Sequence, residues 1–135
     1  MPRVLLITLL TALIGACATA HRSACGRLFP SCDVTAPRPA CKAFTPADSS
    51  VYFLDPARLV GVVPSNDLAA FLGPATAGSA VSVRRHSFAV KAARAEAVWF
   101  YDASGKTDGG FVGEDGLVAI QGCAALAQLT LGIYN

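Results

Sequence analysis

The chain has 135 residues, a formal net charge of +2 and five cysteines, and 53% of its residues are hydrophobic. A charge so close to zero gives no support to nucleic acid as a partner, because proteins that bind it gather an excess of lysine and arginine. The apolar content is too high for a disordered chain, so we expect a packed interior.

An apolar run from Val4 to Ile14 follows the basic residue Arg3. As a helix it would reach roughly 20 Å, short of the roughly 30 Å hydrocarbon core of a membrane, which indicates an export signal. The run ends in Ile14-Gly15-Ala16-Cys17, where an aliphatic residue and two small residues precede a cysteine. This ending resembles the lipobox of bacterial lipoproteins. The resemblance implies that Cys17 becomes the first residue of the mature protein and carries fatty acyl chains such as palmitate.

Two alternatives remain for this segment. Ala18-Thr19-Ala20 also has the small-x-small pattern of ordinary signal peptidase cleavage, which would release a soluble protein beginning near His21. The apolar run could instead remain as an uncleaved anchor. If Cys17 is lipidated, Ala18 stands where enteric inner-membrane lipoproteins have aspartate, which favours the outer membrane over the inner, with the domain facing the periplasm.

The other four cysteines form an even set, which we expect to pair as disulfides in the oxidising cell envelope. Sequence cannot choose among the three possible pairings. Our preference is a small loop closed by Cys25 and Cys32 and a long bridge from Cys41 to Cys123. The cysteines lack the close spacing of a zinc site, so we expect neither a metal nor a cofactor.

These features predict three parts: a lipoprotein signal peptide over residues 1–16, a lead-in over residues 17–48 and a single domain over residues 49–135. The lead-in is rich in proline, which excludes a regular helix and removes hydrogen-bond donors from strands. We expect it to be loop-rich and linked by disulfides. About 119 residues remain after cleavage, which suits one domain with a modest core.

The first half of the domain predicts two strands and one helix. Residues 51–54 and 59–63 are short runs of β-branched or aromatic residues, which favour strands, and residues 55–58 predict the turn between them. A helix is expected over residues 65–72, with Ser65 as its cap and Gly73-Pro74 as its end. Three apolar residues should share the buried face of this helix: Leu68, Phe71 and Leu72.

The second half predicts an antiparallel meander. Alternating apolar residues predict strands on either side of a bulge near His86, and then a turn or frayed connection over residues 92–97. Whether residues 88–98 form a strand or a helix stays open, because alanine, arginine and glutamate favour a helix while their neighbours favour a strand. The most strand-like stretch is Val98 to Tyr101. A hairpin loop is expected over residues 102–106. Two strands follow over 110–112 and 117–120, with a glycine turn over 113–116 between them. The last elements are a strand or helical turn over 124–128 and a closing strand over 129–133.

The expected fold class is therefore α+β, with a small antiparallel sheet of about five to seven strands and one short helix. A helix that ends in Leu72-Gly73-Pro74 and a later strand that contains Trp99-Phe100-Tyr101 resemble small SmpA/OmlA-type lipoproteins, which support outer-membrane barrel assembly. That family closes its helix with Leu-Gly-x-Pro after a Gly-Met-Thr-like entry. This chain lacks the x, enters with Val63-Pro64-Ser65 and has additional cysteines, so the resemblance supports only the fold class.

No catalytic constellation is evident in the sequence. Glu114 and Asp115 are adjacent in a predicted glycine-rich turn, whereas a glycosidase holds two carboxyl groups apart across a sugar. Gly105-Lys106-Thr107 resembles the end of a phosphate-binding loop, but Phe100 stands where the motif needs glycine. We expect a protein that is not an enzyme.

Two groups of residues are candidates for a contact surface. Arg84, Arg85 and His86 are the densest positive charge and could face an acidic partner or anionic headgroups, although a solvated strand face is the simpler interpretation. Trp99 and Tyr101 share one side of their strand and could be exposed if the opposite side forms the core.

The expected function is that of a lipid-anchored envelope lipoprotein that binds or scaffolds another envelope protein without catalysis. A periplasmic inhibitor or ligand-binding module is the alternative, and a concave apolar pocket would favour it. A small envelope hydrolase is the third possibility, which burial of Glu114 or Asp115 beside a cleft would favour.

Overall fold

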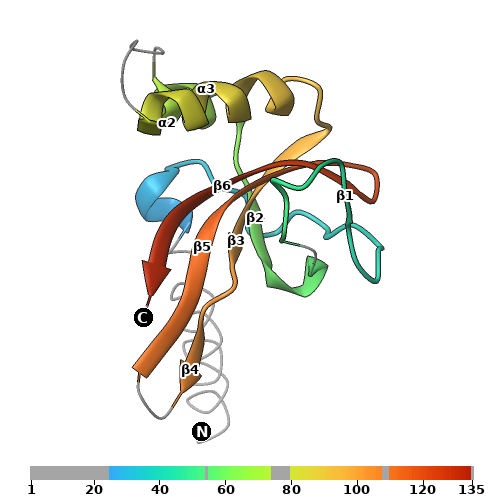
Figure 1. Ribbon diagram of the computed structural model, residues 1–135, viewed down its shortest axis with the longest axis vertical. Coiled ribbons are helices and arrows are strands. Elements are labelled where there is room, and N and C mark those ends of the chain that lie inside the picture. The colour runs from blue at the N-terminus through green and yellow to red at the C-terminus, as the bar shows by residue number, and fades with distance from the viewer. Residues whose placement is uncertain (1–24, 54, 74–79, 108–109, 135) are drawn as a thin grey trace, which may run out of the picture.

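The computed structural model describes residues 25–53, 55–73, 80–107 and 110–134 (Figure 1). Residues 25–28 form one helical turn. The elements that follow are β1 (Thr45–Pro46), the 3-10 helix η1 (Pro56–Arg58), β2 (Leu59–Val62), α2 (Ser65–Leu72), α3 (Ala80–Ala92), β3 (Ala97–Asp102), β4 (Gly105–Thr107), β5 (Gly110–Gln121) and β6 (Ala124–Tyr134).

The strands form one mixed sheet in the order β1-β6-β5-β3-β2, and β4 pairs with β5 beyond the end of β3. All pairs are antiparallel except β1 with β6. The long hairpin of β5 and β6 turns at Gly122, whose φ of +57° lies in the region that favours glycine. The α+β fold class predicted from the sequence is confirmed, although the sheet is not purely antiparallel.

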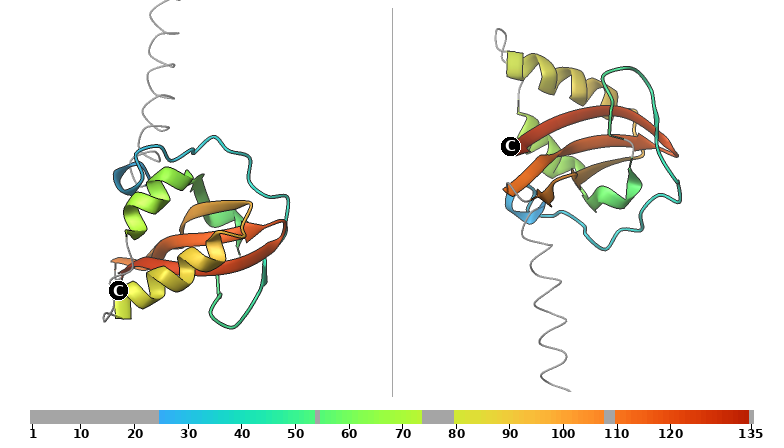
Figure 2. Two further views of the ribbon diagram at one scale, coloured as in Figure 1. Left: turned by 90° about the horizontal axis from the view of Figure 1, so that it is seen from above. Right: turned by 60° about the horizontal axis from the view of Figure 1, so that its bottom comes forward.

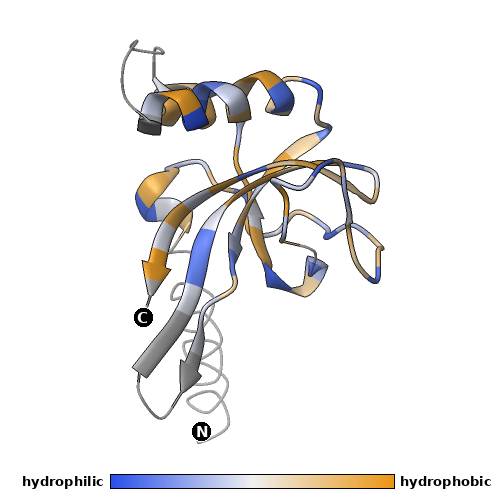
Figure 3. Ribbon diagram, in the orientation of Figure 1, coloured by the Kyte–Doolittle hydropathy of each residue, from blue (hydrophilic) through white to orange (hydrophobic). Residues whose placement is uncertain are grey.

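The helices cover one face of the sheet, here called the helix face (Figure 2). Figure 3 shows hydrophobic and hydrophilic residues interspersed along α3, as expected for a helix with one side on a sheet and the other in water. The buried residues on this face are Cys25, Phe29, Val63, Phe88, Val98, Phe100, Leu117, Ala119, Ala127 and Leu129.

Irregular chain covers the opposite face, here called the loop face. The buried residues there are Phe44, Val51, Phe53, Leu59, Trp99, Tyr101, Val118, Ile120 and Ala125. The segment over residues 51–53, predicted as a strand, is not one. Instead, Val51 and Phe53 point into this core and are 4% and 5% exposed. The Phe53 ring stacks on Tyr101 with the ring centroids 4.2 Å apart, so packing rather than strand pairing holds the segment.

The predicted helix over residues 65–72 is confirmed as α2. It begins after Pro64, which has no side-chain capping bond, so the prediction that Ser65 caps the helix is wrong. Leu68, Phe71 and Leu72 are partly buried against the helix-face core, as expected. Gly73 ends the helix with a φ of +64°. The predicted loop that follows over residues 74–79 lies outside the described residues.

The two strands and bulge predicted near His86 are wrong, because this segment forms α3. The alternating valines misled the prediction: Val83 is 64% exposed and Val90 is 49% exposed, whereas Phe88 is buried at 2%. A helix brings Phe88 and Ala92, four positions apart, onto the same side facing the sheet. Within the described residues, α3 is therefore a helix in addition to the one short helix that was expected. The predicted turn over residues 92–97 is confirmed up to the start of β3.

The predicted hairpin loop over residues 102–106 and the glycine turn over 113–116 are also wrong. The chain continues from β3 into β4, and β5 runs without interruption beside both strands. Gly116 is required for packing and not for a turn. A Cβ atom there would collide with the Leu129 carbonyl and lie 2.8 Å from the Tyr101 hydroxyl. The glycine permits close packing inside a strand. The strand predicted over residues 59–63 and the closing strand over 129–133 are confirmed as β2 and β6.

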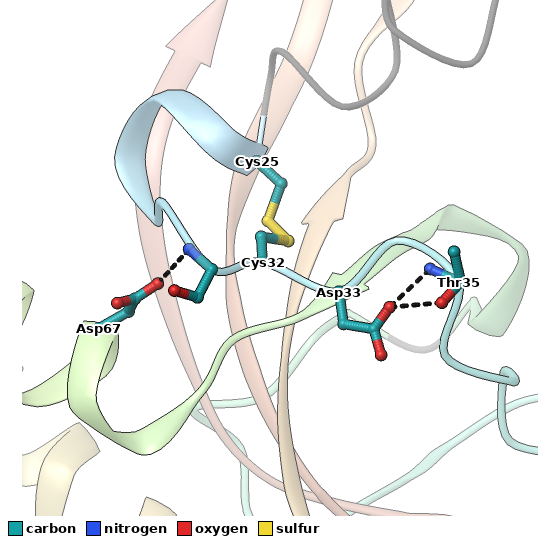
Figure 4. The surroundings of a disulfide bond; sticks show 6 residues. Cys25, Cys32, Asp33, Thr35 and Asp67 are labelled. Carbon is teal, nitrogen blue, oxygen red and sulfur yellow. Dashed lines mark hydrogen bonds between the residues drawn. A yellow bond between two sulfur atoms is a disulfide. The ribbon is translucent and has the colours of Figure 1, made fainter. Parts of the chain in front are cut away.

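The lead-in is integrated into the fold. Cys25 is bonded to Cys32, and Cys41 is bonded to Cys123, which is the preferred pairing from the sequence. The first bridge packs on β2, where a Cβ atom at Gly61 would lie 2.6 Å from the Cys32 sulfur. Figure 4 shows this disulfide near Asp67 at the start of α2. The carboxylate of Asp67 accepts a 2.6 Å hydrogen bond from the backbone amide of Ser31.

The lead-in also pairs with both edges of the sheet. Asp33 forms an isolated antiparallel bridge with Val62 of β2, with two backbone hydrogen bonds of 2.9 Å. Further along, Thr45 of β1 lies in register with Ala124 of β6. The lead-in therefore crosses from one edge to the other, which is why the loop face is covered.

Candidate functional site

The three charged residues proposed as a contact surface lie on α3. Arg84 and His86 are exposed. Arg85 is half-buried, and its guanidinium lies 5.1 Å from the centre of the Phe71 ring in α2, where it links the two helices by a cation–π contact. Arg84 and His86 are therefore accessible, and Arg84 contributes a positive charge there, while Arg85 is partly used in packing.

Trp99 and Tyr101 do not form a contact surface. They are 4% and 0% exposed, because the segment over residues 44–59 covers the loop face. Val98 and Phe100, on the other side of the same strand, are buried under the helices. The sequence argument assumed that one face of the sheet would be open to solvent, and neither is.

Glu114 lies in the middle of a hydrogen-bond network rather than in an exposed turn. Its carboxylate accepts hydrogen bonds from the hydroxyl of Tyr52 at 2.6 Å, the hydroxyl of Tyr101 at 2.9 Å and the side-chain amide of Gln128 at 3.0 Å. The Gln128 carbonyl accepts from the backbone amides of Tyr52 and Phe53 at 3.0 and 2.8 Å. The network therefore joins β3, β5 and β6 to the segment that covers them.

Both tyrosines of this network are held in the neutral form. Burial is the main cause that raises the pKa of Tyr101 well above its ordinary value, and the carboxylate of Glu114 raises it further. Burial, followed by the hydrogen bond to Glu114, also raises the pKa of Tyr52. Because a neutral phenol donates a hydrogen bond, these shifts preserve the network. They favour a structural role for Glu114, whose oxygens are already engaged.

A groove of about 460 Å³ lies beside this network, at the edge of the sheet. Its floor is β6 at residues 127–130, one wall is α3, and the other wall contains Ser50 and Tyr52. Because β1 pairs only with Ala124 and Ala125, the next part of β6 has no strand on its outer side within the described ranges. The groove therefore exposes the backbone edge of a strand.

The wall formed by α3 gives the groove a positive charge. Arg84 and Lys91 both line it. The ammonium group of Lys91 lies 2.8 Å from Asp48, and this contact, together with hydrogen bonds from Ser50, holds the pKa of the Asp48 carboxyl well below its ordinary value. No side-chain acceptor of the described chain pairs with Arg84. Arg84 is thus the positive group in the groove that is available to a ligand.

Sequence reasoning identified Arg84 but missed the rest of the groove. Tyr52 was assigned to a strand, and Gln128 belonged to a segment with two possible structures. The available signal was the alternation of Gln128 and Thr130 with Ala127 and Leu129, which places polar side chains on one face of a strand. What the sequence could not show is that this strand lies at an edge.

Two other hollows are lined mainly by apolar residues. One of about 450 Å³ lies between α2 and α3 and is lined by Leu68, Leu72, Ala89 and Val98, among others. The other, of about 550 Å³, lies under residues 36–41 beside Trp99 and Ile120. Within the described ranges, no cluster of three or more histidine, cysteine or acidic residues is placed to hold a metal ion. No helix of that part of the chain has the length and apolar character needed to cross a membrane.

Comparisons with known proteins do not assign this chain to a family. No protein-family model matches it, and neither a search of curated proteins nor a search of solved structures found a significant match.

Proposed function

We propose that the protein is an exported lipoprotein, attached to a membrane through Cys17, whose folded body binds another component of the cell envelope without catalysis. The observation that carries this proposal is the pairing of all four cysteines that follow Cys17. Disulfides persist in oxidising compartments, and they agree with the export signal and the lipobox-like ending at Cys17. The residue after Cys17 supports the outer membrane, with the body in the periplasm.

The body offers a surface for binding rather than a site for chemistry. Glu114, the carboxylate of the network beside the groove, is engaged by two tyrosines and a glutamine. The groove beside β6 instead presents backbone, an aromatic ring and positive charge, which are features of polypeptide recognition.

Intact-mass analysis of the full chain, with and without reductant, tests the anchor and the disulfides together. We expect a mature N-terminus at Cys17 with fatty acyl mass, and a gain of one hydrogen per remaining cysteine on reduction. In Cys17→Ser, the acyl mass should be absent and the protein should move to the soluble fraction. An N-terminus at His21 without fatty acid would exclude the anchor, and four free thiols in envelope-derived protein would exclude the disulfide-linked body.

A second candidate function, a periplasmic ligand-binding module, is supported by the apolar hollow between α2 and α3. The test is titration with the apolar dye 1-anilinonaphthalene-8-sulfonate. Saturable binding that Leu68→Trp abolishes, without loss of the folded state, would favour this function. Equal dye fluorescence in both proteins would exclude this hollow as the ligand site.

A further inference from the structure

We propose that the groove beside β6 binds an extended, acidic polypeptide segment of an envelope partner, which adds to the outer edge of β6 as a new strand. This inference rests on the binding role proposed above and specifies its site and the chemistry of its partner. It follows from the open strand edge, the positive wall and the exposed aromatic ring, which are contributed by three separate parts of the chain.

The edge of β6 has the properties of a template for strand addition. Residues 127–131 have the sequence Ala-Gln-Leu-Thr-Leu, which contains neither a charged residue nor proline. Exposed edges are usually protected by such residues, because an unpaired edge otherwise recruits another strand. At roughly 3.3 Å per residue this stretch is about 17 Å long, so it matches a peptide of about five residues.

The wall formed by α3 selects the charge of the partner. Arg84 and Lys91 lie seven positions apart, which is about two helical turns, and both reach the groove. Lys91 is paired with Asp48, so Arg84 is the charge that a ligand would meet. The sequence of α3 contains two arginines, one histidine and one lysine, and it contains no acidic residue. Val83, which is 64% exposed, also lines the groove and offers an apolar contact. An added strand should therefore turn acidic side chains toward α3.

The wall that contains Tyr52 would contact the peptide side chains that point away from α3. Tyr52 is 61% exposed, yet its hydroxyl is held by Glu114 at 2.6 Å and by Thr130 at 3.0 Å. An aromatic ring that is fixed in this way contributes contact area at little entropic cost. Because side chains of a strand alternate between faces, every second residue of the peptide would point toward this wall. An apolar residue suits the position beside the ring.

A second copy of this chain fits the groove less well than an acidic segment. Pairing of two β6 edges would bring two α3 helices, each with a positive wall, onto the same ribbon. The resulting repulsion disfavours self-association, whereas the same charges attract an acidic strand.

The test is a titration of the full chain, purified in detergent, with a seven-residue peptide of alternating valine and glutamate. We expect binding together with NMR shifts and amide protection at residues 127–131. Replacing glutamate by lysine in the peptide should abolish binding, and so should N-methylation of alternate peptide amides on the edge that would pair. Arg84→Glu should weaken binding about tenfold, which corresponds to the loss of one close charge pair.

Arg94→Glu is the matched control, because Arg94 is an exposed arginine in the turn after α3 and does not line the groove. It should change the affinity by less than about threefold, since it alters the net charge equally but lies outside the contact. Equal effects of the two variants would overturn the proposal, as would binding of the lysine peptide.

Three further outcomes would also overturn it: absence of binding, a dimer whose β6 amides are protected without peptide, and binding to anionic phospholipid vesicles in place of the peptide. The proposed anchor is judged separately, from mass analysis. Lipidated Cys17 in a protein that ignores the peptide would remove this inference alone.

Discussion

Cys41 and Cys123 lie 82 positions apart in the chain and are joined by a disulfide with a Cα–Cα distance of 5.9 Å. The bridge connects the lead-in to the turn between β5 and β6. Beside it, the backbone amide of Thr45 donates a 2.9 Å hydrogen bond to the carbonyl of Cys123, and β1 begins to pair with β6. The bridge therefore holds the first strand of the sheet against the last.

Removal of the long bridge should destabilise the protein more than removal of the short one. In the chain-entropy model, loss of the Cys41–Cys123 bridge costs about 4 to 5 kcal/mol, and loss of the Cys25–Cys32 bridge costs about 2 to 3 kcal/mol. Urea unfolding of the two double Cys→Ala variants measures the difference. A larger loss for the short bridge would show that native packing around Cys25, and not chain entropy, dominates.

Phe29→Ala should lower the free energy of unfolding by about 3 to 5 kcal/mol, because the ring is fully buried between Phe71 and Phe100 and its removal leaves a cavity. Leu28→Ala is the control, since Leu28 is 42% exposed and should cost less than about 1 kcal/mol. Thermal or urea unfolding gives both values. Similar losses for the two variants would contradict the placement of Phe29 in the core.

Tyr101→Phe should cost about 1 to 3 kcal/mol, because it removes a donor to Glu114 and an acceptor for Gln128 at a fully buried position. The exposed Tyr52→Phe variant loses its own bond to Glu114 and should cost less, because water can replace the hydroxyl. Denaturant unfolding at pH 7 compares them. The opposite order would mean that the outer tyrosine supports the network more than the inner one.

Tyr101 should also lower the free energy of unfolding of the protein at alkaline pH. Folding raises the pKa of Tyr101, so above pH of about 10 the unfolded chain releases the proton first. The stabilisation is therefore complete below that pH and is lost as the pH rises toward the folded-state pKa. Urea midpoints between pH 8 and 11 should fall for the wild type and fall less steeply for Tyr101→Phe. Parallel slopes would exclude Tyr101 as the source.

Gly116→Ala should destabilise the protein by about 1 to 3 kcal/mol, because the new methyl group would collide with the Tyr101 side chain and the Leu129 carbonyl. Gly105→Ala is the control, since nothing lies within 4 Å of the corresponding Cβ position in β4. Unfolding midpoints of the two variants give the comparison. A neutral Gly116→Ala would show that β5 and β6 can separate locally without cost.

Local chemistry was sufficient to predict the elements whose signals are short and unambiguous. The helix that ends at Gly73 and the strand from Val98 to Tyr101 follow from a stop signal and from β-branched or aromatic residues. Export with an even set of cysteines predicts disulfides, without choosing their partners. These features depend on few residues at a time, which is why the sequence determined them.

The errors have a common physical origin in packing between distant segments. The exposed Val83 and Val90 imitate the alternation of a strand, and only contact of Phe88 with the sheet reveals a helix. Gly113 and Gly116 imitate a turn because the reason for Gly116, the nearby Tyr101 and Leu129, lies far away in the chain. The groove was missed for the same reason, since whether a strand lies at an edge depends on the order of the whole sheet.

The buried Cys25 belongs to the folded body. The chain between Cys17 and Cys25 would therefore be the linker between that body and the lipid anchor. Eight residue steps separate Cys17 from Cys25, so even a fully stretched chain spans less than about 30 Å. Combined with acylation of Cys17, this short reach would keep the start of the folded body within about 30 Å of its bilayer. Any partner would then have to come to the membrane surface, as a juxtamembrane or membrane-embedded protein does, instead of being captured from the middle of the periplasm.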